Sequence, residues 1–266
     1  MGSLVIGDLH LGNYYSDILK FLQLLDRARN YSYRINEIIL LGDVVDGIDK
    51  YQSQSYKHYP ETLSLQRNYT RWLIELLHNE FSNAEIVLTL GNHEKDFRGI
   101  ILDEEAIQTS YTFLKIREKY VDTNRFLYIH QLNARMAAIA GWSTLSISLA
   151  LAEISSIENT IKERLAGIVT AHVHRGLSYI VCGGYHLIIM TSFLKDHRTT
   201  AKEAMFNPAI IIVERWGDKV SIDIFSDSFN DNKLISKFND ILSAIIRSEY
   251  RKITSIDKTL KLLDLI

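Results

Sequence analysis

Proline, cysteine, net charge and long apolar runs are all scarce in this chain of 266 residues. The two prolines form no proline-rich linker of the kind that separates domains. The single cysteine, Cys182, excludes a disulfide framework within the chain, as is typical of a protein from a reducing compartment. No apolar run approaches the roughly 20 residues that a membrane-spanning helix needs. The first residues also lack the basic stretch that opens a secretory signal, so we expect a cytoplasmic protein that does not bind a membrane.

The formal charge of −2 is too small to create a field that would attract nucleic acid or an anionic membrane. A local basic groove stays compatible with this value, so nucleic acid is possible as a partner but is not indicated. Hydrophobic residues make up 47% of the chain, which is enough for a substantial core in one large domain. We expect residues 1–230 to form this domain and residues 231–266 to form a C-terminal helical extension packed on or beside it.

Apolar periodicity predicts an α/β fold in which strands and helices alternate along the first part of the chain. We expect helices at about 17–30, 62–81, 103–120 and 145–165, and strands at 3–7, 37–41, 84–90, 125–129, 136–141 and 167–170. Four shorter β-rich segments, at 178–182, 186–193, 208–214 and 219–225, indicate an antiparallel run and therefore a second sheet packed on the first. The predicted architecture is two mixed sheets packed as a sandwich and flanked by helices.

Five of the apolar runs end in side chains that can bind a metal ion. These side chains are Asp8 with His10, Asp43, Asn92, His130, and His172 with His174. All seven are oxygen or imidazole donors, which suit divalent ions such as Mn²⁺, Fe²⁺, Zn²⁺, Co²⁺ or Ni²⁺. Strand ends at one edge of an α/β sheet converge, and residues i and i+2 of an extended segment project to the same side. Seven donors are too many for one tetrahedral ion and suit two ions that share a carboxylate.

Five short sequence blocks surround these residues. They are Gly7-Asp8-Leu9-His10, Gly42-Asp43-Val44-Val45-Asp46, Gly91-Asn92-His93-Glu94, His130 and Ala171-His172-Val173-His174. Together they resemble the signature blocks of the calcineurin-like dinuclear metallophosphoesterases, in order and spacing, over about residues 3 to 195. Two departures stand out, because the last block begins with Ala171 where the family usually has glycine, and Gln131 follows His130 where the family often has glycine. Neither departure removes a ligand.

The resemblance implies a role for each of these residues. Asp8, His10 and His174 would hold the first ion, Asn92, His130 and His172 would hold the second, and Asp43 would bridge both. His93 would lie beside the ions without binding them, and Asp46 would orient its imidazole. Residues 1–230 would then be the metallophosphoesterase domain, with manganese as the expected metal.

The implied reaction is hydrolysis of a phosphate ester by a hydroxide that bridges the two ions, with His93 assisting the leaving group. A phosphodiesterase or phosphatase is the leading hypothesis. A serine/threonine protein phosphatase is disfavoured within it, since the Arg-Gly that follows the second block in those enzymes is replaced here by Gly47-Ile48. A nuclease of the type that acts in double-strand-break repair is the first alternative. An inactive binding scaffold of the same fold is the alternative from a different class, although every expected ligand and His93 are present.

Several features outside the blocks leave questions open. Tyr51, Tyr56 and Tyr59 in the irregular segment 49–61 could line the mouth of the site or only pack, and Arg98 could contact a phosphate. The C-terminal helices could cover the sheet, or they could contact a second copy of the chain in a homodimer. The sequence does not decide the physiological substrate, the native metal or the oligomeric state.

Overall fold

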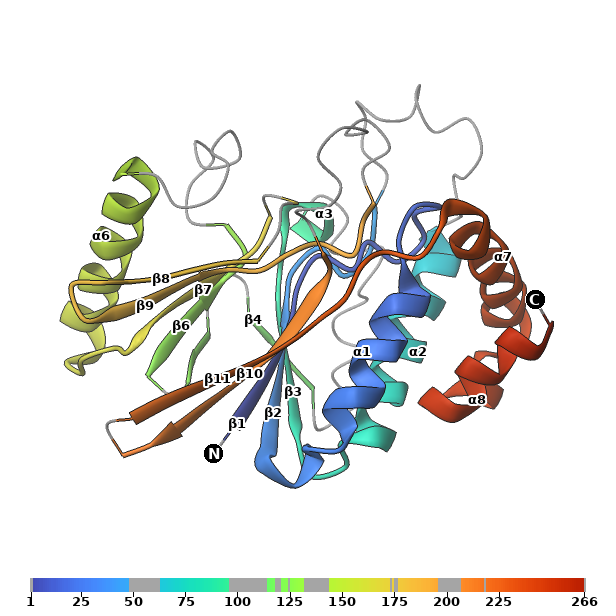
Figure 1. Ribbon diagram of the computed structural model, residues 1–266, viewed down its shortest axis with the longest axis horizontal. Coiled ribbons are helices and arrows are strands. Elements are labelled where there is room, and N and C mark those ends of the chain that lie inside the picture. Colours follow the sequence, from blue (N-terminus) through green and yellow to red (C-terminus); the bar gives the residue numbers. More distant parts are fainter. Residues whose placement is uncertain are drawn as a thin grey trace.

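The computed structural model describes residues 2–47, 63–95, 114–117, 121–123, 125–131, 144–172, 174, 177–195, 207–217 and 219–265. The irregular segment 49–61, Arg98, the predicted strand 136–141 and residues 103–113 of a predicted helix lie outside these ranges. Figure 1 shows the described elements as stacked layers, with helix α6 outside one sheet and helices α1, α2, α7 and α8 outside the other.

The larger sheet has six strands in the order β11-β10-β1-β2-β3-β4. Its strands are β1 (Gly2–Ile6), β2 (Ile35–Leu41), β3 (Glu85–Thr89), β4 (Leu114–Arg117), β10 (Ala209–Trp216) and β11 (Lys219–Ser226). Strands β1 to β4 are parallel, and β10 pairs antiparallel with β1. The carboxyl ends of β1, β2 and β3 therefore meet at one edge, where ligands bind in open α/β sheets.

The smaller sheet has five strands in the order β5-β6-β7-β9-β8. Its strands are β5 (Val121–Thr123), β6 (Phe126–Ile129), β7 (Gly167–Thr170), β8 (Ser178–Cys182) and β9 (Tyr185–Ile189). Strands β6, β7 and β9 are parallel, whereas β5 and β8 pair antiparallel at the two ends of the sheet. The carboxyl ends of β6 and β7 also carry predicted ligands.

The described helices, apart from α3 at the strand ends, cover the outer faces of the two sheets. They are α1 (Ile18–Arg29), α2 (Leu63–Glu80), α3 (Asn92–Lys95), α6 (Thr144–Ile161), α7 (Asn232–Glu249) and α8 (Ile256–Leu260), with 3-10 turns η1 (Ser32–Arg34), η4 (Tyr250–Ile253) and η5 (Lys261–Leu265). In Figure 1, α7 and α8 lie outermost, against α1 and α2. Within the described ranges, no helix is long and apolar enough to span a membrane.

Alternating side chains of the buried strands fill separate cores. In β2, Ile38 and Leu40 point into the core beneath α1 and α2, while Ile39 and Leu41 point into the core between the sheets. This period of two follows from the pleat of a strand. A third core lies between the smaller sheet and α6, where Leu127 and Ile168 pack against Ile154. A strand that is apolar on both faces therefore lies at the centre of this sandwich, as the apolar runs predict.

The C-terminal helices share the core of the main domain. Phe238, Leu242 and Ile246 of α7 are fully buried in the same cluster as the apolar faces of α1 and α2. Trp72 of α2 also donates a hydrogen bond from Nε1 to the carbonyl of Ile253, at 3.1 Å. The apolar face of α7 is thus covered by its own chain. A boundary at residue 230 and a homodimer through these helices both stay predictions.

The predicted sandwich of two mixed sheets with flanking helices is confirmed. The helix expected to continue to residue 120 is wrong over Leu114–Arg117, which form strand β4 and pair in parallel with β3. Leu114 and Ile116 pair with Ile86 and Leu88, so the alternating apolar residues of this short segment extend the sheet. Four residues are too few for periodicity to separate helix from strand, and pairing with β3 decides the outcome.

The expectation that all four late β-rich segments lie in the second sheet is also wrong. β8 and β9 do form a hairpin in the smaller sheet, but β10 and β11 join the larger sheet beside β1. Residues Ile210–Val213 of β10 are apolar at four consecutive positions, and all are buried. A run of this kind needs cover on both faces, which β10 finds between the two layers next to β1.

Candidate metal centre

The predicted ligands lie on sharp turns at the ends of the central strands. Asp8 and His10 follow β1, Asp43 follows β2, and His172 and His174 follow β7. All five have a positive backbone φ, between 44° and 76°, although none is glycine. Residues other than glycine adopt this backbone conformation at an energetic cost, and such residues cluster at functional sites. Only two other non-glycine residues in the described ranges, Arg125 and Lys162, share this property.

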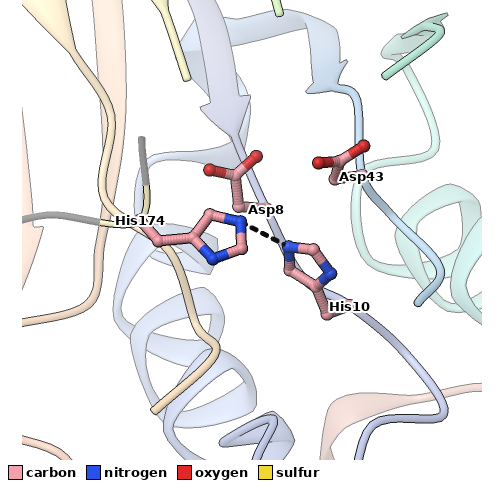
Figure 2. Close-up of side chains that lie close together, drawn as sticks. All are labelled: Asp8, His10, Asp43 and His174. Carbon is pink, nitrogen blue, oxygen red and sulfur yellow. Dashed lines mark hydrogen bonds between the residues drawn. The ribbon is translucent and has the colours of Figure 1, made fainter. Parts of the chain in front are cut away.

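A first cluster consists of Asp8, His10, Asp43 and His174, each of which offers a donor atom within 4.8 Å of the others. Figure 2 shows these side chains facing one another, from the segments that follow β1, β2 and β7. Nε2 of His10 lies 2.9 Å from Nε2 of His174. Both imidazoles therefore present nitrogen atoms to the same space, as two ligands of one ion would.

A second cluster consists of Asp43, His130 and His172, again within 4.8 Å of one another. Nε2 of His130 lies 3.1 Å from Oδ2 of Asp43 and 3.2 Å from Oδ1 of Asn92. Asp43 is therefore common to both clusters. The structure brings all seven predicted ligands together in the two groups that the sequence blocks imply, while their binding of metal stays a prediction.

Three polar atoms at this centre are buried and make no hydrogen bond of good geometry among the described residues: Oδ1 of Asp8, Nδ1 of His172, and Oδ2 of Asp43, whose contact of 3.1 Å with Nε2 of His130 is an ion pair. Buried polar atoms without a partner are costly, and few occur in a folded protein. The carboxylates of Asp8 and Asp43 are also completely buried. A divalent cation would satisfy these atoms and offset the negative charge, so the donor set fits the metal ions that the family implies.

The electrostatics of the centre also suit a cation. Burial raises the pKa of Asp8 to about 7, although His130 acts in the opposite direction. Burial disfavours charge on His130 too, but the carboxylates of Asp43 and Asp8 outweigh it and raise the pKa of this imidazole to about 9. Burial and the neighbouring His130 lower the pKa of His172 to about 4. Burial and His10 likewise hold the pKa of His174 well below its ordinary value, so both imidazoles are neutral at pH 7.

His93 lies beside the second cluster, at the start of α3. Its Nδ1 contacts the main-chain oxygen of Asp46. Its Nε2 faces the centre and lies 4.0 Å from Oδ2 of Asp43. A carbonyl oxygen can only accept, so Nδ1 carries a proton and Nε2 is the atom that can gain or lose one.

Asp46 contacts two histidines through different atoms. The contact that was expected to orient His93 is made by the main-chain oxygen of Asp46 and not by its carboxylate. The carboxylate of Asp46 instead lies 3.2 Å from Nδ1 of His10 and accepts a hydrogen bond of 3.0 Å from the side chain of Asn13. Asp46 thus orients a predicted ligand with its side chain and the predicted acid with its backbone.

Glu94 is a site residue to which sequence reasoning gave no role. Its fully buried carboxylate accepts hydrogen bonds from four main-chain amides, those of Asp43, Val44, Val45 and Gly91, at 2.6–3.2 Å. These contacts tie the turn after β3 to the turn that carries Asp43. Its place at the end of the third block was visible in the sequence, but nothing local shows that it bonds to residues about fifty positions away.

The glycines of the second and third blocks allow this close approach. A Cβ atom at Gly91 would overlap the carboxylate of Asp43, and one at Gly42 would overlap the ring of His130. Gly42 also has a φ of 76°. Both glycines are therefore required by the packing of the ligands themselves.

Two clusters of side chains that could hold metal ions thus lie at the strand ends of a two-sheet sandwich, as expected for a metal-binding phosphoesterase. The family model described as calcineurin-like phosphoesterase matches residues 1–186. The chain belongs to that family. Membership supports hydrolysis of phosphate esters with divalent metal ions, and the clustered aspartates and histidines agree with it. No curated protein is significantly similar to the chain in sequence.

Several solved structures resemble the chain in fold. Vps29 from Entamoeba histolytica in complex with zinc is 12% identical, with a TM-score of 0.41, and the match covers 86% of this chain and 100% of that one. Vps29 from Chaetomium thermophilum is 14% identical, with a TM-score of 0.44 and coverage of 86% and 99%. A hypothetical protein from Thermus thermophilus is 12% identical, with a TM-score of 0.41 and coverage of 85% and 100%. Similarities at this level carry no argument about function.

Proposed function

We propose that this protein is a phosphodiesterase or phosphatase that uses two divalent metal ions, with manganese as the expected metal. Asp8, His10 and His174 would hold one ion, Asn92, His130 and His172 would hold the other, and Asp43 would bridge them. The observation that carries the proposal is the position of Asp43, whose donor atoms belong to both clusters. Bound ions would supply the positive charge that activates water and neutralises the phosphoryl oxygens.

The chain's own residues would complete the reaction. Protonated Nε2 of His93 would donate its proton to the leaving oxygen, because Nδ1 is already committed to the carbonyl of Asp46. Asp46 would hold the imidazole of His10 in place through Nδ1, so that Nε2 stays directed at the cluster. Glu94 would keep the Asp43 turn at a fixed distance from His93, whose backbone amide donates to Oδ1 of Asp43 at 3.1 Å.

Two other functions remain to be separated from this one. A nuclease would use the same centre, but the formal charge of −2 gives no support to a large phosphate-binding surface. A binding scaffold without activity would not need His93 or a complete ligand set. All seven predicted ligands and His93 are present and close together, which favours turnover.

The test is a panel of substrates with purified protein in added Mn²⁺. We expect hydrolysis of bis-(p-nitrophenyl) phosphate, loss of activity with EDTA, and about two Mn²⁺ per chain at saturation. Cyclic nucleotides, monoesters, and single- and double-stranded DNA in the same panel would separate a small-molecule esterase from a nuclease. Asp43→Asn should abolish binding at both sites, whereas His174→Ala should leave one. A protein that binds two ions but hydrolyses nothing would favour the scaffold.

A further inference from the structure

Residues 8–12, which follow β1 and include Asp8 and His10, are called the first metal loop. The segment Asn13–Asp17 joins this loop to α1, and it contacts the metal centre on one side and the C-terminal segment on the other. On the side of the metal centre, Asn13 donates a hydrogen bond of 3.0 Å to Oδ1 of Asp46. The same Oδ1 atom lies 3.2 Å from Nδ1 of His10. The main chain of Tyr15 in turn donates to Oδ1 of Asn13 at 2.9 Å, so the side chain of Asn13 is fixed at both ends.

On the other side, Asn239 of α7 holds the main chain of the same segment. Its Nδ2 donates to the carbonyl of Tyr14 at 3.1 Å and to the carbonyl of Ser16 at 2.9 Å. Asn239 is 6% exposed, so these bonds are largely shielded from water. The carbonyl oxygens of Tyr14 and Ser16 each need a donor, and Nδ2 of Asn239 carries two N–H groups. Among uncharged side chains of this size, only asparagine has two donors on one atom.

The backbone of α7 is fixed independently of this contact. Phe238 and Leu242, on either side of Asn239 in the helix, are fully buried against α1 and α2. A side chain on a well-packed helix holds its partners more firmly than one on a loop. Asn239 therefore couples the position of a rigid helix to the loop that leaves the first cluster.

A second contact reaches the same segment from the residues before α7. The backbone amide and the side-chain amide of Asn230 both donate to the carboxylate of Asp17, at 2.8 and 2.9 Å. Asp17 also caps α1 by accepting from the amide of Lys20. Asn230 and Asn239 both lie beyond residues 1–186, to which the family model matches. These side-chain contacts to the segment Asn13–Asp17 therefore come from a part of the chain that the family model does not include, as do its main-chain hydrogen bonds to Phe193 and Lys195.

We propose that Asn239 is a positioning residue for the metal site: it holds residues 13–16 against α7 and thereby fixes Asn13, Asp46 and the imidazole of His10. The C-terminal helical segment is then part of the working site and not only a cover for the sheet. This inference rests on the proposed function for its effect on metal binding. Its structural half, the ordering of residues 13–16 by Asn239, does not.

The experiment compares Asn239→Ala and Asn239→Leu with Ser243→Ala as the matched control. Ser243 lies one turn further along α7, is 7% exposed and bonds to Tyr69 of α2 at 2.8 Å. It lines the same small cavity as Asn13 and Tyr14 but makes no hydrogen bond to residues 13–17 among the described residues. Asn239→Leu keeps most of the side-chain volume, so it separates the loss of two donors from the loss of packing. Thermal unfolding of each variant shows that it is folded before further measurement.

Two readouts follow on the metal-free and metal-loaded proteins. Hydrogen–deuterium exchange of the peptide containing residues 9–17 should be faster in both Asn239 variants and unchanged in the control. The affinity for Mn²⁺ should fall about tenfold in both Asn239 variants and stay within about twofold in the control, as expected when an outer partner of a ligand is lost. At saturating Mn²⁺, kcat/KM of both Asn239 variants should be close to that of the parent protein, because excess metal compensates for weaker binding.

The outcomes separate the two proposals. If the parent protein binds no Mn²⁺, the proposed function fails, while exchange at residues 9–17 still tests the role of Asn239. If the parent binds Mn²⁺ and the Asn239 variants bind it equally well with unchanged exchange, the positioning role is wrong. Equal losses in Ser243→Ala and the Asn239 variants would also overturn it, because they would reflect general loosening of α7.

Discussion

Nε2 of His130 lies 3.1 Å from Oδ2 of Asp43, in a setting where both side chains are almost completely buried. This pairing raises the pKa of His130 to about 9, so the imidazole is protonated at neutral pH in the metal-free protein. A metal ion can bind the imidazole only after that proton leaves. We therefore expect the release of at least about one proton per chain when Mn²⁺ binds at about pH 7.5.

The sign of the pH dependence follows from the same pKa. Between about pH 7 and pH 9 protons compete with the metal for His130, so the apparent affinity should rise about tenfold per pH unit and level off above that range. Below about pH 7 the rise should be steeper, because Asp8, with a pKa of about 7, also takes up a proton there. His172 contributes no proton in this range because its pKa is about 4. Titration calorimetry in two buffers with different ionisation enthalpies measures the proton count. Identical apparent enthalpies in both buffers would contradict the expected release.

Replacement of His93 should lower turnover without removing metal. His93→Asn retains a donor near the position of Nδ1, which contacts the carbonyl of Asp46, but removes Nε2. We expect kcat to fall about 10²–10⁴-fold on a diester with an alkoxide leaving group, which needs a proton, and less on a p-nitrophenyl ester. Steady-state kinetics on both substrates measures the difference. Equal losses on the two substrates would argue against proton donation, and Mn²⁺ content should match the parent protein.

Glu94 should be needed for stability as well as for the site. In Glu94→Gln, an NH₂ group replaces one of two oxygens that each accept from two backbone amides, so donors face donors. We expect the free energy of unfolding to fall by about 1–3 kcal/mol, as measured by urea denaturation. Glu85→Gln is the control, since Glu85 is partly exposed and pairs with exposed Lys115, and it should change stability by less than about 0.5 kcal/mol. Similar losses in both variants would show that the four amide bonds do not matter.

The sequence predicts the sandwich and its candidate centre because both depend on local patterns. Apolar runs such as Ile38–Leu41 mark central strands, and the polar residue that ends each run marks the edge of the sheet where ligands meet. The two groups of predicted ligands were inferred from the resemblance of five blocks; the structure brings Asp8, His10, Asp43 and His174 together, and Asp43 with His130 and His172, while metal binding by them stays a prediction. The topology of β10 was not predictable in this way, since a continuous apolar run is compatible with a strand next to β1 and with a strand in the other sheet.

The residues that support the centre were missed for a related reason. Asn13, Glu94 and Asn239 are common polar residues, and nothing adjacent to them in the chain distinguishes them from surface residues. Their roles come from contacts across 33 positions in the case of Asn13 with Asp46 and 225 positions in the case of Asn239 with Tyr14. Only the fold brings these partners together, and a single sequence carries no record of such pairs.

Backbone strain outside the centre offers a last prediction. Lys162 follows α6 directly and has a φ of 61°, the left-handed conformation that commonly ends a helix and that glycine adopts most easily. Its side chain is exposed and belongs to none of the ligand blocks, so nothing links its strain to catalysis. Lys162→Gly should therefore raise the free energy of unfolding by about 1 kcal/mol and leave Mn²⁺ affinity unchanged.

By contrast, His174→Gly relieves a φ of 45° but removes a predicted ligand, so it should weaken Mn²⁺ binding whatever it does to stability. Urea denaturation and metal titration of both variants measure the contrast, and a loss of stability in Lys162→Gly would show that the left-handed conformation there carries no strain.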